Sequence, residues 1–208
     1  MIDVYTANTP NGLKIPMALE EMGVSHALHK LDLSRNDQKQ PAFLRINPNG
    51  RIPAIVDHDA PGANGPVSVF ESGAILLHLA ERFGQLIPSD TLGRARALEY
   101  LFFQVGGVGP MFGQAGWFQR NAPELSVAVK RYQDESARLT TVLESRLAAS
   151  PWLAGDSYSI ADIAHFGWLR VAPTYLGMDM TPYPAVQAWV QAIASRPATQ
   201  RALTALGG

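Results

Sequence analysis

The sequence predicts an α/β domain with a mixed sheet, followed by an all-helical domain. Short segments in which apolar and polar residues alternate, typical of strands, occur only within residues 1–84. Apolar residues at helical spacing dominate residues 93–208. Residues 85–92 contain Pro88 and follow neither period, so they are predicted to link the two domains.

The first part of the α/β domain reads as strand, helix, strand. Residues 2–7 alternate, and a Thr-Pro-Asn-Gly turn at 9–12 follows them. A helix is predicted over 14–22, because apolar residues recur there at i, i+3, i+4 and i+7 and Gly23 comes next. Residues 26–33 alternate again. This order favours a parallel strand pair with a right-handed crossover.

The second part predicts two strands joined by a hairpin loop. A short helix is predicted over residues 41–45 and a strand over 53–57, and a polar loop leads to a returning strand at 67–70. Ser72 is predicted to cap a helix that runs to about Phe83. The whole order, βαβ and then αββα, is the thioredoxin-like plan, a small mixed sheet with helices on its faces.

The second domain is predicted to be a bundle of helices. Apolar residues at helical spacing mark one helix near 98–105, a long one over 125–143, and a last clear one over 183–195. Ser159 and Asp162 form a capping box that begins another helix. The sequence gives no strand signal in this part.

Charge and hydropathy exclude several partners. The chain has 17 basic and 18 acidic residues and no basic stripe with interleaved aromatics, so no nucleic acid partner is predicted. The N-terminus lacks the basic and apolar regions of a signal peptide, which favours a cytoplasmic protein. Tyr100 to Gln119 carries no charge, but its glutamines, glycines and Pro110 favour buried helices over a membrane span.

The absence of cysteine limits the chemistry. None of the 208 residues is Cys, which excludes disulfides, zinc-thiolate sites and a thiol nucleophile of the protein's own. Any thiol chemistry must therefore use a thiol brought in from outside. His26 and His29 are three apart on a predicted strand and face opposite sides, so no metal site is predicted.

Two segments resemble signatures of the cytosolic glutathione transferases. Residues 47–55, Asn-Pro-Asn-Gly-Arg-Ile-Pro-Ala-Ile, resemble the NPxGxxPxL motif, and residues 70–75 resemble the xESxAI motif. The capping box at Ser159 resembles the folding box of that family's helical domain. The Thr-Pro-Asn-Gly turn, Gln38 and residues 104–111 look like the bacterial Nu-class, disulfide-bond oxidoreductase branch, which is itself similar to a fungal nitrogen-regulation protein.

The resemblance implies a homodimer in which glutathione lies across the first domain. Pro53 occupies the cis-proline position, where the Ile52 N–H and C=O would clamp a peptide such as glutathione. Glu71 and Ser72 stand at a helix N-terminus, which suits the γ-glutamyl end: the hydroxyl and free N–H groups for its carboxylate, and the Glu71 side chain for its ammonium. The alternatives are a structural turn and an ordinary helix cap.

Thr9 and Asn11 are the candidate catalytic residues. They lie where the first strand meets the first helix, and a hydroxyl or amide N–H there can donate to a sulfur and favour the thiolate. The common transferase classes use Tyr, Ser or Cys for this purpose, and this sequence departs from them. The resemblance makes Gln38 a contact to the main chain or the carboxylate of glutathione, and it makes Arg131 a residue that reaches the ligand from the partner subunit. Each of these could also be a solvated surface residue.

Three functions are consistent with these residues. The first is glutathione-dependent disulfide-bond reduction, in which bound glutathione thiols replace protein cysteines. The second is a transferase that conjugates glutathione to small electrophiles or reduces peroxides with it. The third is a non-catalytic, glutathione-binding regulatory protein, as in the fungal relative, whose long appended segment this sequence is expected to lack. Two glutathiones, or one glutathione disulfide, at each site would favour the first.

Overall fold

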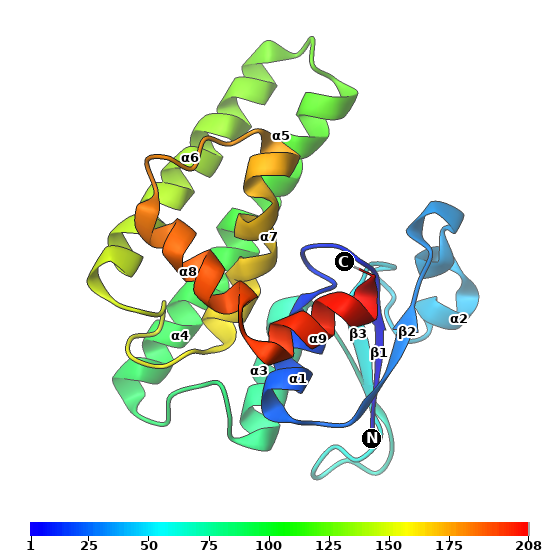
Figure 1. The fold of residues 1–208 in the computed structure, drawn as a ribbon. Helices are drawn as coiled ribbons and strands as arrows, with labels where there is room; N and C mark the ends of the chain where they lie inside the picture. The colour runs from blue at the N-terminus through cyan, green and yellow to red at the C-terminus, as the bar shows by residue number, and fades with distance from the viewer. Residues whose placement is uncertain (208) are drawn as a thin grey trace. The chain divides into compact units, whose positions relative to one another are not determined.

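The computed structural model describes residues 1–207, and contacts divide the chain into two compact units. The first unit comprises residues 1–87 and the residues from Ser195 onward, and the second comprises residues 88–194. Figure 1 shows the sheet within the first unit and helices throughout the second. The predicted fold class, a thioredoxin-like mixed sheet and a helical bundle, is confirmed.

The sheet has four strands in the order β2-β1-β3-β4. Strands β1 (Ile2–Thr6) and β2 (His26–Lys30) pair in parallel, as the strand–helix–strand order predicts. Strands β3 (Ala54–Asp57) and β4 (Val67–Phe70) complete the sheet in antiparallel pairings. Strand β2 ends three residues earlier than expected, because Asp32 accepts the Ser34 N–H at 2.9 Å and begins the 3₁₀ turn η1 (Leu33–Arg35).

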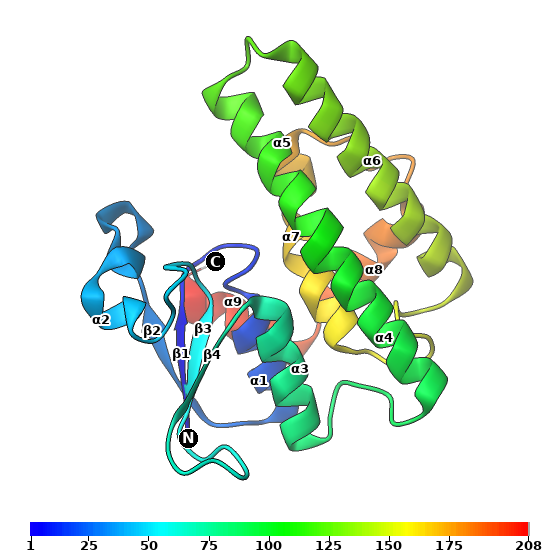
Figure 2. The same cartoon turned by 180° about the vertical axis from the view of Figure 1, so that it is seen from behind.

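Four helices belong to the first unit. Helices α1 (Lys14–Met22) and α3 (Ser72–Phe83) pack side by side on one face of the sheet (Figure 2). The short helix α2 (Pro41–Leu44) follows the 3₁₀ turn η2 (Asp37–Lys39). The core between the sheet and the two long helices consists of fully buried apolar side chains, among them Val4, Ile15, Leu19, Ile55, Ile75, Leu76 and Leu79.

The fourth helix, α9 (Pro197–Leu206), comes from the far end of the sequence and packs on α1. Arg196 and Arg201 form ion pairs with Glu21 and Glu20 on α1, at 2.6 and 2.5 Å. The sequence division placed this segment with the helical domain, whereas its contacts place it in the first unit. The reason is the apolar face of α9, Ala198, Ala202 and Leu206, which is buried.

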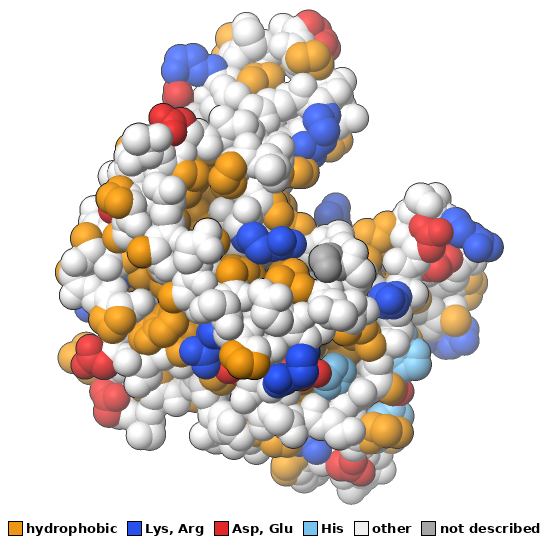
Figure 3. Space-filling model, in the orientation of Figure 1, with side chains coloured by type: hydrophobic (Ala, Val, Ile, Leu, Met, Phe, Trp, Pro, Cys, Tyr) orange, Lys and Arg blue, Asp and Glu red, His pale blue; other side chains and the backbone are white. Residues whose placement is uncertain are grey.

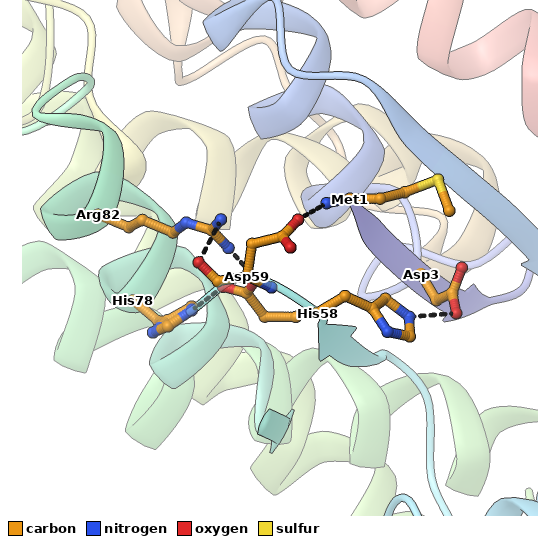
Figure 4. A network of polar contacts seen from close by, with 7 residues as sticks. Met1, Asp3, His58, Asp59, His78 and Arg82 are labelled. Carbon is orange, nitrogen blue, oxygen red and sulfur yellow. Dashed lines mark hydrogen bonds and ion pairs between the residues drawn. The ribbon is translucent and has the colours of Figure 1, made fainter. Parts of the chain in front are cut away.

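A polar network fixes the end of α3. Asp57, the last residue of β3, is fully buried and pairs with both Arg82 and His78 of α3. Figure 4 shows these two side chains beside the neighbouring pairs of Met1 with Asp59 and of His58 with Asp3. Arg82 and His78 hold the pKa of the Asp57 carboxyl below its usual value, although burial acts in the opposite direction. The C-terminal half of α3 is therefore tied to the end of β3.

The second unit is helical throughout its described elements. Helix α4 (Thr91–Phe103), the π-helical segment η3 (Gln104–Val108) and helix α5 (Gly109–Asn121) follow one line, and α6 (Ser126–Ala149) runs back beside α5 (Figure 2). Helices α7 (Ile160–Leu176) and α8 (Pro184–Ala194) complete the unit.

The capping box at the start of α7 is present as predicted. Ser159 and Asp162 satisfy each other's backbone N–H groups. The buried Asp162 carboxylate also accepts the Leu153 N–H at 3.0 Å and the Trp189 indole N–H at 2.9 Å. Burial raises the pKa of this carboxyl, and the donated hydrogen bonds oppose that change. One side chain thus joins the loop before α7, the helix itself and α8.

Among residues 1–207, none of the helices has both the length and the apolar character that crossing a membrane requires. Basic and acidic side chains are mixed on the face drawn in Figure 3, in keeping with a net charge of −1.

Candidate functional site

The sheet register brings the predicted site segments of the first unit to one edge. Tyr5 of β1 lies opposite Ala54 of β3, and Ala54 lies opposite Phe70 of β4. The turn after β1, the residues before β3 and the residues after β4 therefore meet at the same edge of the sheet. These are the positions of Thr9 and Asn11, of Ile52 and Pro53, and of Glu71 and Ser72.

The turn after β1 contains the two candidate catalytic residues. Thr9 Oγ1 accepts a hydrogen bond from the Gly12 N–H at 3.0 Å. Because Oγ1 is the acceptor in this bond, the Thr9 O–H proton remains for another acceptor. Asn11 lies half-buried in the same turn. Both side chains stand just before α1, as the sequence predicts.

Gly12 allows this turn to fold back over the end of β1. The Thr6 hydroxyl donates to the Gly12 carbonyl at 2.7 Å, and a Cβ at Gly12 would overlap the Ala7 carbonyl oxygen. No other residue type fits at this position without moving the turn. The position of Thr9 and Asn11 thus depends on a glycine three residues after Thr9.

Asn47 shapes the second site segment. Its buried side chain donates to the Arg51 carbonyl at 2.6 Å and accepts the Asn49 N–H at 2.9 Å. The Ile52–Pro53 peptide bond that follows is cis, as the resemblance implies. Because the first paired residue of β3 is Ala54, Ile52 precedes the ladder and lies at the edge of the sheet.

Glu71, and not Ser72, is the N-cap residue of α3, so the prediction that Ser72 caps this helix is wrong. Ser72 is the first helical residue, and no side chain among the described residues caps the helix. Glu71 has φ 71° and ψ 114°, a backbone conformation that residues other than Gly seldom adopt. Its exposed carboxylate lies 3.5 Å from the Asn49 amide nitrogen.

The first turn of α3 therefore offers unused donors. The Ile75 N–H bonds to the Glu71 carbonyl at 2.9 Å, but the preceding N–H groups of the turn have no side-chain acceptor within residues 1–207. The helix dipole adds a partial positive charge at the same place. A carboxylate is the ligand group that these donors suit.

Lys14 is a residue of this site that sequence reasoning missed. It is the first residue of α1, it is 1% exposed, and its Nζ donates to Ser72 Oγ at 3.1 Å. Burial lowers the pKa of Lys14 to about 7, and the nearby Glu71 charge opposes the change. A signal was present in the sequence: Lys14 precedes Ala18 by four residues and Met22 by eight, which places it on the buried face of the helix.

The residues at this end of the sheet form an edge cluster, which comprises Thr9, Asn11, Ile52, Pro53, Glu71 and Ser72. Gln38 and Arg131 lie outside it. Gln38 is half-buried in η2, and its Oε1 atom is buried without a hydrogen bond from any described residue. An acceptor in that state favours a ligand N–H group. Arg131 is exposed on α6 in the second unit, where it lines a groove of about 910 Å³ with Met111, Tyr132, Lys130, Glu135 and Arg138.

The edge cluster has hydroxyl and amide donors but no cysteine, and within residues 1–207 no group of His, Asp or Glu side chains is arranged to hold a metal ion. It can bind a carboxylate at the start of α3 and an ammonium at Glu71. It can also donate hydrogen bonds from Thr9 to an anion beside the first turn. These groups bind and stabilise charges, and the reacting sulfur must come with the ligand.

Comparison with known proteins agrees with these features. Residues 9–82 match the family model for the glutathione S-transferase N-terminal domain, and residues 110–197 match that for the C-terminal domain. The disulfide-bond oxidoreductase YfcG of Escherichia coli (strain K12) is 52% identical over 204 residues, which cover 98% of this chain and 94% of that protein.

Two crystal structures show the same fold. A glutathione transferase of Burkholderia graminis, with two glutathione molecules bound per subunit, is 43% identical and has a TM-score of 0.92, covering 99% of this chain and 88% of that one. A glutathione transferase of Pseudomonas putida, with one glutathione disulfide bound per subunit, is 39% identical and has a TM-score of 0.92, covering 100% and 92%. The sequence matches, the fold and the motifs together show that this chain belongs to the glutathione transferase family.

Proposed function

We propose that this protein is a glutathione-dependent disulfide-bond oxidoreductase that works with the thiols of bound glutathione. The observation that carries this proposal is the absence of cysteine from a thioredoxin-like unit whose site donors remain in place. Without a thiol of its own, the unit can exchange disulfides only with borrowed sulfur. The N-terminus of α3, Glu71 and the Ile52 backbone would bind the peptide, and Gln38 would accept one of its N–H groups.

Thr9 and Asn11 are the catalytic residues in this proposal. Neither is a base strong enough to remove a thiol proton, so their part is to donate hydrogen bonds that stabilise the thiolate. A decrease of one unit in a thiol pKa corresponds to about 1.4 kcal/mol, which is within the range of one charge-assisted hydrogen bond. A thiolate with a pKa near the ambient pH is the best attacker of a disulfide.

The reaction balances with two glutathiones. A first thiolate attacks the substrate disulfide, which forms a mixed disulfide and releases one substrate thiolate. A second thiolate then attacks the glutathione sulfur of the mixed disulfide and releases the other. The two glutathione thiol protons end on the two substrate thiols, and the glutathiones leave as their disulfide.

Three relatives support this assignment over conjugation. The Burkholderia structure holds two glutathiones per subunit and the Pseudomonas structure holds the oxidised pair, which are the reactants and the product of such an exchange. The Escherichia coli relative is itself named a disulfide-bond oxidoreductase. A transferase that conjugates needs only one glutathione at each site.

The test compares two reactions of the purified protein at equal glutathione concentration. Reduction of a small model disulfide is expected to exceed conjugation of an aryl halide by at least about tenfold, or about 1.4 kcal/mol in barrier. If conjugation is faster, the protein is a conjugating transferase. If glutathione binds and neither reaction exceeds the uncatalysed rate, the regulatory alternative replaces both.

A further inference from the structure

The hydrogen bond between Lys14 and Ser72 has a fixed direction while Lys14 is protonated. An ammonium group has three donors and no acceptor, so Ser72 Oγ must accept the bond at 3.1 Å. A hydroxyl has one proton of its own, and this proton is then left for a different acceptor. A neutral Lys14 amine could accept instead, and the Ser72 hydroxyl could turn and donate to it.

The position of Lys14 is unfavourable for a cation unless an anion is nearby. It is 1% exposed, it begins α1, and it reaches the first residue of α3, so positive ends of two helix dipoles are close to it. Burial of a charge is costly unless the charge is paired. Glu71 supplies one negative charge next to Ser72, but its carboxylate is exposed and lies near Asn49.

The other charged groups of the neighbouring elements are engaged elsewhere. Glu20 and Glu21, at the far end of α1, pair with Arg201 and Arg196 of the α9 segment. On α3, His78 and Arg82 pair with Asp57 of β3. Glu81, ten residues from Glu71, lies about 15 Å along the helix. The charge of Glu71, beside Ser72, acts on Lys14 and favours its protonated form.

We propose that Lys14 is a positioning residue whose ammonium holds Ser72 as a donor to the carboxylate of the bound peptide, so that glutathione affinity falls when Lys14 loses its proton. This inference rests on the proposed function and names how its binding site is regulated. It assigns Lys14 no contact with the ligand and no part in the sulfur chemistry.

The pKa of about 7 places the change within the physiological range. A group with that pKa is mostly protonated at pH 6 and about one-tenth protonated at pH 8. Apparent affinity decreases in proportion to the competent fraction, so binding is expected to be about tenfold weaker at pH 8 than at pH 6.

The test measures calorimetric dissociation constants for S-methylglutathione from pH 5.5 to 8.5. This ligand has no thiol to titrate, so its own sulfur adds no pH dependence. Wild type is expected to show the tenfold loss, whereas Lys14→Met is expected to bind more than about tenfold more weakly at pH 6 with little further change. Lys14→Arg, which keeps its charge throughout, is expected to give a flat profile with stronger binding than Lys14→Met. Lys30→Met, which removes a charge from an exposed lysine, is the matched control and should follow wild type.

A double-mutant cycle distinguishes positioning from direct contact. If Lys14 acts through Ser72, Lys14→Met has no further effect on affinity when Ser72→Ala is already present. A further loss in that background would mean that Lys14 contacts the ligand, and the inference would be wrong. The inference is also wrong if the dissociation constant of wild type does not change with pH, or if its pH dependence persists in Lys14→Met. If wild type fails to bind S-methylglutathione at any pH, the proposed function itself is wrong.

Discussion

The indole N–H of Trp189 donates to the Asp162 carboxylate at 2.9 Å, and both side chains are buried in the helical unit. Every group that faces this carboxylate in the structure is a donor: Trp189, Leu153 and the N–H and hydroxyl of Ser159. An amide in place of this carboxylate would therefore direct its N–H₂ group at one of these donors, whichever way the side chain is turned.

Asp162→Asn is expected to destabilise the protein by about 2–4 kcal/mol, because the new amide donor must face an existing donor in a buried site. Urea denaturation measures this change. Asp134→Asn is the control, since it alters an exposed carboxylate that pairs with Lys130 and is expected to cost less than about 1 kcal/mol. Equal decreases in the free energy of unfolding of the two variants would show that the buried hydrogen bonds contribute no more to stability than an exposed ion pair does.

Two variants of Glu71 can distinguish its effect on stability, through backbone strain, from its effect on ligand binding. Glu71→Gly is expected to be about 1 kcal/mol more stable than Glu71→Ala, because Gly adopts the observed φ of 71° at lower cost. Both variants are expected to bind glutathione at least about tenfold more weakly, since both lack the carboxylate that we propose pairs with the γ-glutamyl ammonium. Denaturation and calorimetry give the two readings, with Glu124→Gln as an exposed control. Unchanged affinity in both variants would remove Glu71 from the site.

Thr9→Val is expected to slow disulfide reduction about tenfold, because the variant keeps the size of the side chain and loses the O–H donor. Thr9→Ser, which keeps the hydroxyl, is the matched control and is expected to retain most of the rate. Steady-state rates at saturating glutathione isolate this effect from binding. If Thr9→Val and Thr9→Ser are equally impaired, the hydroxyl does not act on the sulfur.

The stability of the free protein is expected to rise with pH above 7. The unfolded chain keeps the Lys14 proton up to about pH 10.5, whereas burial makes the folded protein release it at about pH 7. The folded state thus binds fewer protons between these values, and the free energy of unfolding increases there by up to about 1.4 kcal/mol per pH unit. Denaturation from pH 6 to 9 should show this slope in wild type and in Lys130→Met, an exposed control, but not in Lys14→Met. This prediction is wrong if the free energy of unfolding changes with pH in the same way in wild type and in Lys14→Met.

We expect a homodimer to which Arg131 contributes. Exposed apolar residues of the helical unit, such as Phe102 and Val127, and the groove beside Arg131 favour association with a second copy. Sedimentation at micromolar concentration should give twice the mass of 22.5 kDa. Arg131→Ala is expected to weaken glutathione binding while the dimer persists, and Arg94→Ala serves as a basic-residue control. A monomer would exclude any role for Arg131 at a partner's site.

Much of this molecule could be predicted from its sequence, because its signals are local. The strands, the cis-proline turn and the capping box are each encoded within fewer than ten consecutive residues. Helix α9 was missed because its second turn holds few large apolar residues, although Pro197 marks its start and Ala198, Ala202 and Leu206 share one face.

The site needed information that local patterns do not contain. Helical spacing places Lys14 on a buried face, but Lys14 and Ser72 are 58 residues apart, and only the packing of α1 on α3 shows that the two side chains meet. The cap of α3 was misplaced by one residue for a related reason. A positive φ at Glu71 is imposed by its surroundings, and no sequence preference of Glu indicates it.

The packing of α9 on α1 has a consequence for how the chain is made. The first unit is made of two separate segments of the chain, and the whole of the second unit is synthesised between them. All elements of the helical unit have emerged before α9 exists, so that unit can complete its fold during synthesis while α1 still exposes the surface that α9 will cover. The first unit to begin is thus the last to finish, contrary to the usual order in which N-terminal domains fold first.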